Sequence, residues 1–288
     1  MTNIAILLVI ISSGFHAYWN YIIRRSENPE ISTFLVSLIG GFLIFPFAIY
    51  VYFTSGIPNN GWWYILATVI IHAFYFFSLS RVYVKSELST GYPIARGSAV
   101  GLVPLLAIIL INEEINFFSA ISIFLIFCGV IIVGLGTIKI KNIKQNVSYL
   151  SLFYALSTGF FIALYSIVDK KAVEIIDPII FLFFVLAPSS LSVYFFNSRV
   201  RNFKNICSIF KKQSISLLIG GLCTLTAYLL VLNAYKISQV SYVAPFREIG
   251  IVFGVLMGYF LLNEKISKTK ISGLVFILIG AFMISIFS

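Results

Sequence analysis

Apolar runs of about 20 residues recur along the whole chain, and no other feature restricts its folding as strongly. A helix of that length, at about 1.5 Å per residue, crosses a hydrocarbon layer of about 30 Å. The runs do not alternate with polar residues, which favours helices over the strands of a membrane barrel. Ten spans are predicted: 3–23, 31–53, 61–84, 89–111, 117–138, 148–168, 178–197, 214–235, 239–262 and 270–287. The predicted fold class is an all-α membrane protein with ten transmembrane helices.

The composition agrees with this class and leaves little room for a soluble domain. Of the 288 residues, 60% are hydrophobic and 10% charged, and the mean hydropathy is +1.01, far from the values of soluble domains. The longest connection, around 198–213, is about the size of a surface helix. The first run has no basic segment before it and no cleavage site, so we expect it to be retained as a helix. The three cysteines match neither a disulfide framework nor a metal-ligand spacing, and we expect no metal and no cofactor.

The basic residues are sorted to one side of the predicted membrane. Three of the 20 Lys and Arg residues, Lys170, Lys171 and Lys236, lie in the connections after even-numbered spans. The fifteen in the connections after odd-numbered spans are Arg24, Arg25, Arg81, Lys85, Lys139, Lys141, Lys144, Arg199, Arg201, Lys204, Lys211, Lys212, Lys265, Lys268 and Lys270. Cytoplasmic loops carry such an excess, so both termini are predicted to be extracytoplasmic in a multi-pass protein of the inner (plasma) membrane. The net charge of +10 is thereby explained without nucleic acid.

The chain repeats itself with a shift of 151 residues. That shift places "ARGSAVGLVPLLAIILINEEI" over "FREIGIVFGVLMGYFLLNEKI" and aligns Arg96 with Arg247, and a shift of 152 aligns Pro93 with Pro245. Two units of five helices are predicted, at 1–144 and 145–288. Because five is odd, the second unit must cross the membrane in the opposite sense to the first. Inverted repeats are typical of secondary transporters, with substrate near the midplane and alternating access between the repeats.

The two aligned arginines are the leading candidates for substrate binding. A charged side chain in a membrane helix costs about 2.5–3.5 kcal/mol on insertion scales, and is therefore a functional hypothesis by default. The guanidinium of Arg96 or Arg247 offers a planar fork that suits a carboxylate or phosphate. The alternative is a structural lock, in which each arginine binds backbone carbonyls or pairs with a carboxylate. Glu248 follows Arg247 directly, favours this alternative there, and is the candidate group for proton coupling.

Prolines and small residues accompany both arginines. Pro93 and Pro245 each remove a helix hydrogen bond, so kinked spans or a broken first turn are predicted. Freed backbone at membrane depth is tolerated where it lines a cavity or is buried in protein. Gly97 and Gly250 follow in the two copies and permit close helix contact. A hinge at these four residues is the functional hypothesis, and plain packing of the glycines is the alternative.

Further candidates for substrate contact lie in spans 1, 3, 4 and 8. His16, Trp19 and Asn20 share one stripe of the first span by helical spacing. His72 lies in the middle of the third span, and two histidines on different helices without other ligands do not predict a metal site. Tyr75, Tyr92 and Tyr228 belong to a large set of aromatic residues that either contact lipid and core or stack on an aromatic or cationic substrate.

The dipeptide Asn-Glu occurs in both halves where spans 4 and 9 leave the membrane. It consists of Asn112 and Glu113 in the first half, and of Asn263 and Glu264 in the second. We expect a structural role for these glutamates, by capping or pairing at a tight turn before the next helix.

Several of these motifs resemble the drug/metabolite transporter superfamily, in particular its ten-helix EamA-type members. They are "HAYWNYIIRR" in the first span, "YPIARG" in the fourth, "APFRE" in the ninth, and "NE" before a glycine-bearing last helix in each half. The resemblance covers the whole chain. It implies an inner-membrane carrier with a central cavity lined mainly by spans 1, 3, 4, 6, 8 and 9. Substrates across the superfamily are diverse, so the resemblance does not name one.

The leading hypothesis is a secondary active transporter or exchanger for a small metabolite, whether amino acid-like, an organic cation or an anion. A Walker A pattern is absent, which argues against direct use of ATP. An intramembrane enzyme is an alternative, but the chain has no G-x-S-x-G motif and no adjacent pair of aspartates, so we expect no enzyme. A membrane scaffold or small channel is the other alternative. The expected partners are a small-molecule substrate and the lipid bilayer, and a monomer and an oligomer are both compatible with the sequence.

Overall fold

The computed structural model describes residues 1–85, 88–136, 149–196 and 200–288, with side chains except at 80, 83–85, 88–93, 135 and 196. Ten helices in these ranges are long and apolar enough to cross a membrane, which confirms the predicted fold class. The first half contains α1 (Asn3–Arg25), α2 (Pro29–Ser55), α3 (Gly61–Lys85), α4 (Leu88–Ile111) and α5 (Phe117–Leu135). The second half contains α7 (Tyr149–Val173), α8 (Pro178–Phe196), α9 (Phe203–Ile237), α10 (Val240–Phe246), α11 (Ile249–Leu262) and α12 (Lys268–Phe287).

Three helices differ from the predicted spans. The sixth span was predicted to end at residue 168, but α7 continues to Val173 and so contains Asp169. The ninth span is divided into α10 and α11 by a break at Arg247 and Glu248, just after Pro245, as the proline predicts. The eighth begins earlier than predicted, at Phe203, because a short helix joins it across the non-helical Gln213. This short helix is the surface helix expected in the longest connection.

Asparagine ends α4 and α11 in the same way. Asn112 and Asn263 have φ angles of 55° and 54°, a left-handed conformation that Asn tolerates better than most residues with a side chain. The backbone N–H of Glu113 then donates to the carbonyl of Ala107, and that of Glu264 donates to the carbonyl of Gly258. The repeated Asn-Glu dipeptide is therefore a helix-ending turn, as expected.

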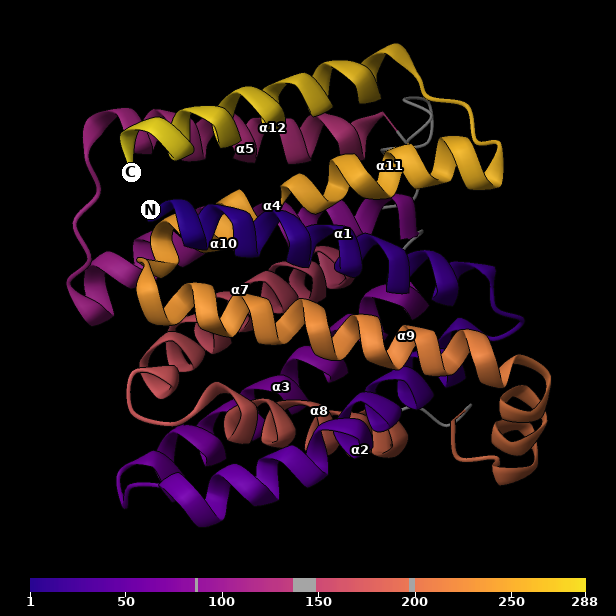
Figure 1. Ribbon diagram of the computed structural model, residues 1–288. Coiled ribbons are helices and arrows are strands. Elements are labelled where there is room, and N and C mark those ends of the chain that lie inside the picture. Colours follow the sequence, from indigo (N-terminus) through magenta and orange to yellow (C-terminus); the bar gives the residue numbers. More distant parts are fainter. Residues whose placement is uncertain (86–87, 137–148, 197–199) are drawn as a thin grey trace.

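Most helices of the first half pack on helices of the second half (Figure 1). Helix α5 packs on its counterpart α12 at one flank of the molecule, and α2 packs on its counterpart α8 at the other. Between these flanks, α1 packs on α9, and the equivalent helices α7 and α3 also pack together. Likewise, α4 packs on α7, and the equivalent helices α11 and α1 pack together. Each contact is thus repeated with the halves exchanged, as a two-fold relation between them requires.

Glycines set the close approach of α5 to α12. A Cβ atom at Gly129 would lie 2.7 Å from the carbonyl oxygen of Gly273, and one at Gly280 would lie 2.6 Å from the carbonyl oxygen of Ser122. Small residues of this kind let membrane helices approach each other closely. The shift of 151 residues relates Gly129 to Gly280 and Ser122 to Gly273, so these are two equivalent contacts with the halves exchanged.

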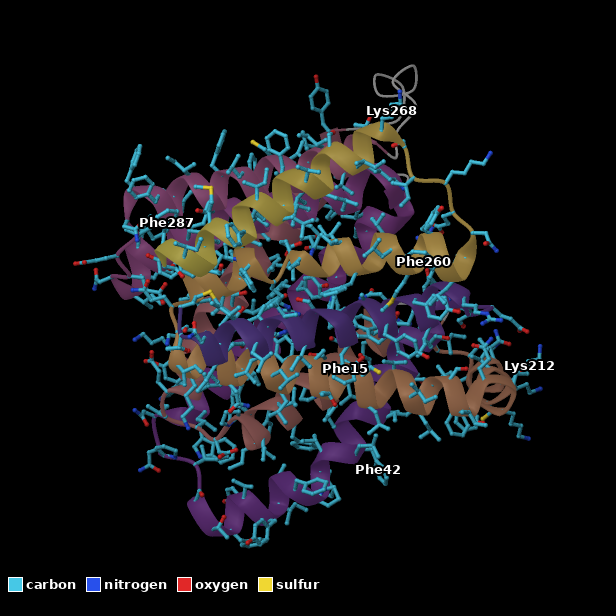
Figure 2. The ribbon with its side chains drawn as sticks, turned by 45° about the horizontal axis from the view of Figure 1, so that its top comes forward. Phe15, Phe42, Lys212, Phe260, Lys268 and Phe287 are labelled. Carbon is cyan, nitrogen blue, oxygen red and sulfur yellow. The ribbon has the colours of Figure 1, made fainter. Side chains whose placement is uncertain are left out.

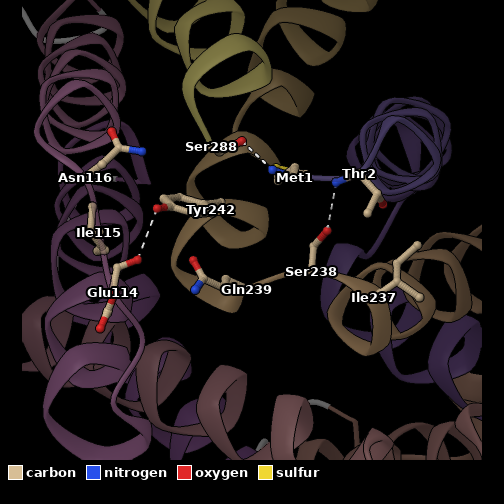
Figure 3. A pocket seen from close by; sticks show the side chains of 10 residues that line it. All are labelled: Met1, Thr2, Glu114, Ile115, Asn116, Ile237, Ser238, Gln239, Tyr242 and Ser288. Carbon is tan, nitrogen blue, oxygen red and sulfur yellow. Dashed lines mark hydrogen bonds between the residues drawn. The ribbon is translucent and has the colours of Figure 1, made fainter.

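Apolar side chains cover the outside of the bundle (Figure 2). Phe42 and Phe260 are 76% and 70% exposed on this surface. A soluble protein rarely exposes so many large apolar groups, whereas hydrocarbon requires them. Lys212 and Lys268 lie at one end of the bundle, here called the basic end (Figure 2). The chain termini meet at the opposite end, here called the terminal end. There the Met1 amino group donates to the Ser288 hydroxyl at 2.7 Å (Figure 3).

Candidate substrate site

Buried polar and charged side chains gather where the two halves meet. Asp169 and Thr68 are completely buried, and His72 and Glu248 are 4% and 5% exposed. They come from α7, α3 and the break between α10 and α11. Polar groups are expensive inside a membrane protein and are placed where they find partners or line a functional cavity. This cluster, with the arginines and aromatic residues around it, is the candidate site.

Asp169 joins three helices through its carboxylate. Its Oδ1 atom accepts a hydrogen bond from the Thr68 hydroxyl of α3 at 2.8 Å, and its Oδ2 atom accepts one from the Tyr228 hydroxyl of α9 at 2.5 Å. Among the described residues, no Lys or Arg side chain lies at ion-pair distance from it. Asp169 is thus a buried carboxyl group held by two hydroxyl groups.

His72 extends this group along α3. Its Nδ1 atom lies 2.9 Å from the Thr68 carbonyl oxygen and 3.1 Å from the Thr68 hydroxyl. A carbonyl oxygen only accepts, so Nδ1 carries the hydrogen. The imidazole stacks on Tyr165 with ring centroids 4.3 Å apart, and Tyr75 meets the Tyr165 ring edge-on at 5.7 Å. These rings form an aromatic wall beside Asp169.

Arg247 lies in the break between α10 and α11. Its guanidinium carbon is 5.5 Å from the centroid of the Tyr228 ring, and it interacts electrostatically with Tyr235 and Tyr165. The Nε atom is buried and forms no hydrogen bond among the described residues. No described carboxylate lies at ion-pair distance from this guanidinium. Its backbone carbonyl accepts a hydrogen bond from the Ser13 hydroxyl of α1.

Arg96, the repeat counterpart of Arg247, has a different environment. Its NH2 atom lies 2.7 Å from Oε1 of Glu248, and the two side chains are 14% and 7% exposed. This ion pair ties α4 of the first half to the helix break of the second. His16 of α1 lies within electrostatic range of both arginines and accepts a hydrogen bond at Nδ1 from the Trp19 indole at 3.2 Å.

The structure brings most of the predicted site residues together. Arg96, Arg247, Glu248, His16, Trp19, His72, Tyr75 and Tyr228 lie in or beside the cluster. Asn20 donates to the carbonyl of His16 within its own helix. The side chains of Tyr92 and Pro93 lie outside the described residues.

The predicted hinge glycines have different surroundings. A Cβ atom at Gly97 would lie 2.6 Å from the Ile131 side chain, so this glycine serves the packing of α4 on α5. At Gly250 a Cβ atom would make only ordinary contact with Ser13 at 3.6 Å. Pro245 lies in α10, two residues before the break. The backbone of α4 is helical from Leu88 to Ile111.

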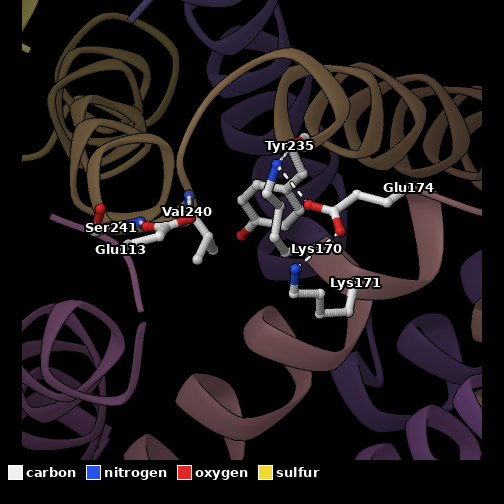
Figure 4. Close-up of polar contacts among 7 residues, drawn as sticks. All are labelled: Glu113, Lys170, Lys171, Glu174, Tyr235, Val240 and Ser241. Atoms are coloured by element: carbon white, nitrogen blue, oxygen red, sulfur yellow. Dashed lines mark hydrogen bonds and ion pairs between the residues drawn. The ribbon is translucent and has the colours of Figure 1, made fainter. Parts of the chain in front are cut away.

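Sequence reasoning missed Asp169 and Thr68. Asp169 precedes Lys170 and Lys171, and such a charged run is usually the solvated end of a span. In the structure, Lys170 donates to the α9 carbonyl of Tyr235 at 2.6 Å (Figure 4). Asp169 instead binds Thr68 inside the bundle. The only signal in the sequence was an acidic residue within one turn of an apolar run.

Buried hydrogen bonds join the two halves at the terminal end. The Glu113 carboxylate accepts hydrogen bonds from the backbone N–H groups of Val240 and Ser241, both at 2.9 Å (Figure 4). The Tyr242 hydroxyl donates to the carbonyl of Glu114 at 3.2 Å, as Figure 3 shows. An anion at the first N–H groups of a helix is favourable, so Glu113 caps α10.

The basic end is joined by more exposed contacts. Arg24 pairs with Glu264 at 2.6 Å, and Lys212 pairs with Glu27 at 3.0 Å. Glu264 is the repeat counterpart of Glu113, and it thus pairs with a surface arginine. The expected structural role of both glutamates is confirmed by these contacts.

A cavity of about 570 Å³ opens at the terminal end (Figure 3). Its lining includes Met1, Glu114, Ser238 and Tyr242, from both halves. None of the charged residues of the buried cluster lines it. It is therefore a surface cavity beside the contacts that join the halves there.

The fold and the buried cluster define an internally duplicated, ten-span membrane protein whose charged residues meet between its halves. The model of the EamA-like transporter family matches residues 1–135 and 149–286. The chain belongs to the EamA-like transporter family, which confirms the resemblance found in its motifs and implies membrane transport; proteins of such a family are generally not enzymes. A solved structure described only as "Crystal structure of protein" is similar in fold, with 15% identity, a TM-score of 0.67 and coverage of 98% of this chain and 99% of that one. No curated protein matches the sequence.

Proposed function

We propose that the protein is a secondary carrier that moves a small metabolite with an anionic group by alternating access, and that Arg247 binds that group. The observation that carries this proposal is the buried guanidinium of Arg247, which has no carboxylate partner among the described residues. A lone charge at membrane depth costs about 2.5–3.5 kcal/mol or more. An anionic substrate supplies the missing partner, through the planar fork that suits a carboxylate or phosphate.

The contrast with Arg96 supports this assignment. Arg96 is paired with Glu248 at 2.7 Å, so it fits the structural alternative, a lock between the halves. Two equivalent positions of an ancestral repeat thus have different roles in this proposal. One arginine holds the bundle together, and the other is available to a ligand.

The aromatic residues near Arg247 suit the body of an organic substrate. The guanidinium lies over the Tyr228 ring, and Tyr165, which stacks on His72, is also near it. Binding sites for small molecules are mainly apolar and aromatic, with a few polar groups that fix orientation. A small metabolite with one anionic group and an apolar or aromatic part fits this environment.

Alternating access is supported by the distribution of contacts and by the helix break. At the terminal end the halves are joined by buried contacts such as those of Glu113, whereas the ion pairs of the basic end are exposed. In the proposed cycle, the halves rock about the cluster, and the contacts of Glu113 open when the terminal end opens. We propose further that the basic end faces the cytoplasm of the inner membrane, which follows from its excess of Lys and Arg.

Uptake into proteoliposomes tests this proposal. A thermal-shift screen against carboxylates, phosphate esters, zwitterions and organic cations selects ligands, and radiolabelled uptake then measures saturation and acceleration by internal unlabelled ligand. We expect saturable, counterflow-accelerated uptake of an anionic ligand, lost in Arg247→Gln and retained in Lys211→Ala, a control at an exposed lysine. Unsaturable flux indicates a channel instead, ligand turnover without a sealed vesicle indicates an enzyme, and uptake of organic cations alone contradicts the role of Arg247.

A further inference from the structure

We infer that Asp169 is the proton-binding group of this carrier, and that one proton bound there travels in the same direction as one anion bound at Arg247. The inference rests on the proposed function, since it takes Arg247 as the anion site. It replaces the sequence-based hypothesis that Glu248 couples transport to protons.

The environments of the two acidic residues decide between them. Oε1 of Glu248 lies 2.7 Å from the Arg96 guanidinium, which compensates its charge. Asp169 is completely buried and is held only by the hydroxyl groups of Thr68 and Tyr228 among the described residues. A buried carboxylate with no cation at ion-pair distance is costly, so Asp169 is the acidic residue of the cluster that gains most from a proton.

The site satisfies both states of the carboxyl group. When Asp169 is ionised, the hydroxyl groups of Thr68 and Tyr228 each donate to one of its oxygens. When it is protonated, its O–H group donates to the phenolic oxygen of Tyr228, which then turns its own hydrogen away. A proton therefore binds and leaves at Asp169 without leaving a buried carboxylate oxygen unbonded.

Tyr228 connects this site to Arg247. Its hydroxyl group binds Asp169, and its ring lies 5.5 Å from the guanidinium carbon of Arg247. Arg247 thus places a positive charge next to the tyrosine that holds Asp169, and a nearby cation favours the ionised form of a carboxyl group. An anion bound at Arg247 cancels that effect, so the anion and the proton each strengthen the binding of the other. This linkage is reciprocal by thermodynamic necessity, and it predicts symport.

No other charged group described around α7 provides a comparable counter-charge. The helices that pack on α7 are α3, α4, α8, α9 and α10. From them come His72 and Tyr75 (α3), Arg96 in its pair with Glu248 (α4), Tyr194 (α8), Tyr228 and Tyr235 (α9), and Arg247 just after α10. On α7 itself, Lys170 binds Glu174 at 3.2 Å and the carbonyl of Tyr235. Arg247 is therefore the cation through which a bound anion changes the proton affinity of Asp169.

A proton fits this site better than a metal cation. Hard cations take several oxygen ligands at once. The described groups around Asp169 supply one carboxylate and two hydroxyl groups, and no cluster of three or more His, Cys, Asp or Glu residues is found in the described part of the chain.

The test begins without any substrate. Infrared spectra of the full-length protein in liposomes, recorded over a pH series, report the C=O stretch of protonated carboxyl groups. We expect a titrating band in the wild-type minus Asp169→Asn difference spectrum, and Glu248→Gln should retain that component. Asp169→Asn keeps the size of the side chain and an oxygen for the Thr68 hydroxyl, and thermal unfolding checks that the variant is folded. A difference spectrum without a titrating band, or loss of that component in Glu248→Gln, overturns the inference.

A second variant tests the linkage to Arg247. Arg247→Gln removes the nearby cation, so the titration midpoint of the Asp169 band should move to higher pH. Lys211→Ala should leave it unchanged. An unmoved midpoint in Arg247→Gln overturns the linkage, and a band that shifts with sodium at constant pH overturns the choice of the proton.

Transport measurements separate this inference from the proposed function. With an anion that the carrier moves, an imposed proton gradient should drive accumulation in the wild type. Asp169→Asn should lose that accumulation and retain exchange of external for internal anion. If Arg247→Gln loses exchange and Asp169→Asn keeps it, the anion site at Arg247 is supported. If Asp169→Asn still accumulates the anion, the proton site is contradicted but the anion site is not. If no anion is moved at all, the proposed function fails and the infrared titration still decides whether Asp169 binds a proton.

Discussion

The ion pair between Arg96 and Glu248 is expected to make a large contribution to stability. Replacement of Arg96 by Met leaves the carboxylate of Glu248 buried without its partner, and the side chains are only 14% and 7% exposed. Breaking a buried pair by removal of one member costs about 3–5 kcal/mol, because the remaining charge is uncompensated. Arg96→Met should therefore lower the free energy of unfolding by about that amount.

The double variant Arg96→Met/Glu248→Gln provides the cleanest comparison. It removes both charges, so most of the lost stability should return, since replacement of a whole buried pair by neutral groups is often nearly neutral. The four proteins of this cycle give the coupling energy between the two residues. Arg96→Lys keeps the charge and should fall between the wild type and Arg96→Met.

Unfolding in mixed micelles, followed by circular dichroism at increasing SDS fraction, measures these differences. Arg24→Met is the matched control, because it breaks an ion pair with Glu264 in which the arginine side chain is 65% exposed. An exposed pair is worth about 0–1 kcal/mol, so this variant should change little. The reasoning is refuted if Arg96→Met unfolds like the wild type, or if the double variant is as unstable as the two single losses added together. An Arg96→Lys protein that is fully stable but no longer transports would place Arg96 in the substrate site instead.

Three further predictions concern the two ends of the molecule and the packing of its flank. Glu113→Gln leaves one of the two capped N–H groups without its acceptor, so spin-label distances across the terminal end should lengthen in that variant and stay unchanged in Glu114→Gln. A reporter fused at Ser288 should be active only when it is of the periplasmic type, and activity of a cytoplasmic reporter there would show the opposite orientation. Gly129→Ala places a Cβ atom 2.7 Å from a carbonyl oxygen of α12 and should destabilise the protein by about 1–3 kcal/mol. Gly14 has open space around it, so Gly14→Ala should not destabilise the protein. Equal unfolding transitions in the two variants would contradict the packing described for this flank.

The spans could be predicted from the sequence because the thickness of the hydrocarbon layer sets a length that apolar runs must match. A kink or a broken turn was predicted at both Pro93 and Pro245, but α4 is continuous through Pro93, and only the ninth span is broken, two residues after Pro245. The repeat identified Arg96 and Arg247 as related positions. These features depend on one segment, or on two segments compared with each other.

The pairing of side chains could not be predicted in the same way. A lock was one of two alternatives for each arginine, and only the arrangement of α4 against the break of the second half pairs Arg96 with Glu248. Asp169 was missed because the end of a helix in the membrane is decided by its tertiary partners. Tyr228 and Thr68, distant in sequence, hold its carboxyl group inside the bundle, whereas local hydropathy places it in solvent.

The adjacency of the first and last residues has a consequence for how such a chain can be built. The amino group of Met1 already touches the hydroxyl group of Ser288, so a linker of a few residues would close the backbone into a ring. New ends could then be opened in a surface connection such as the turn between α2 and α3, and the second half would then be translated before α1 and α2.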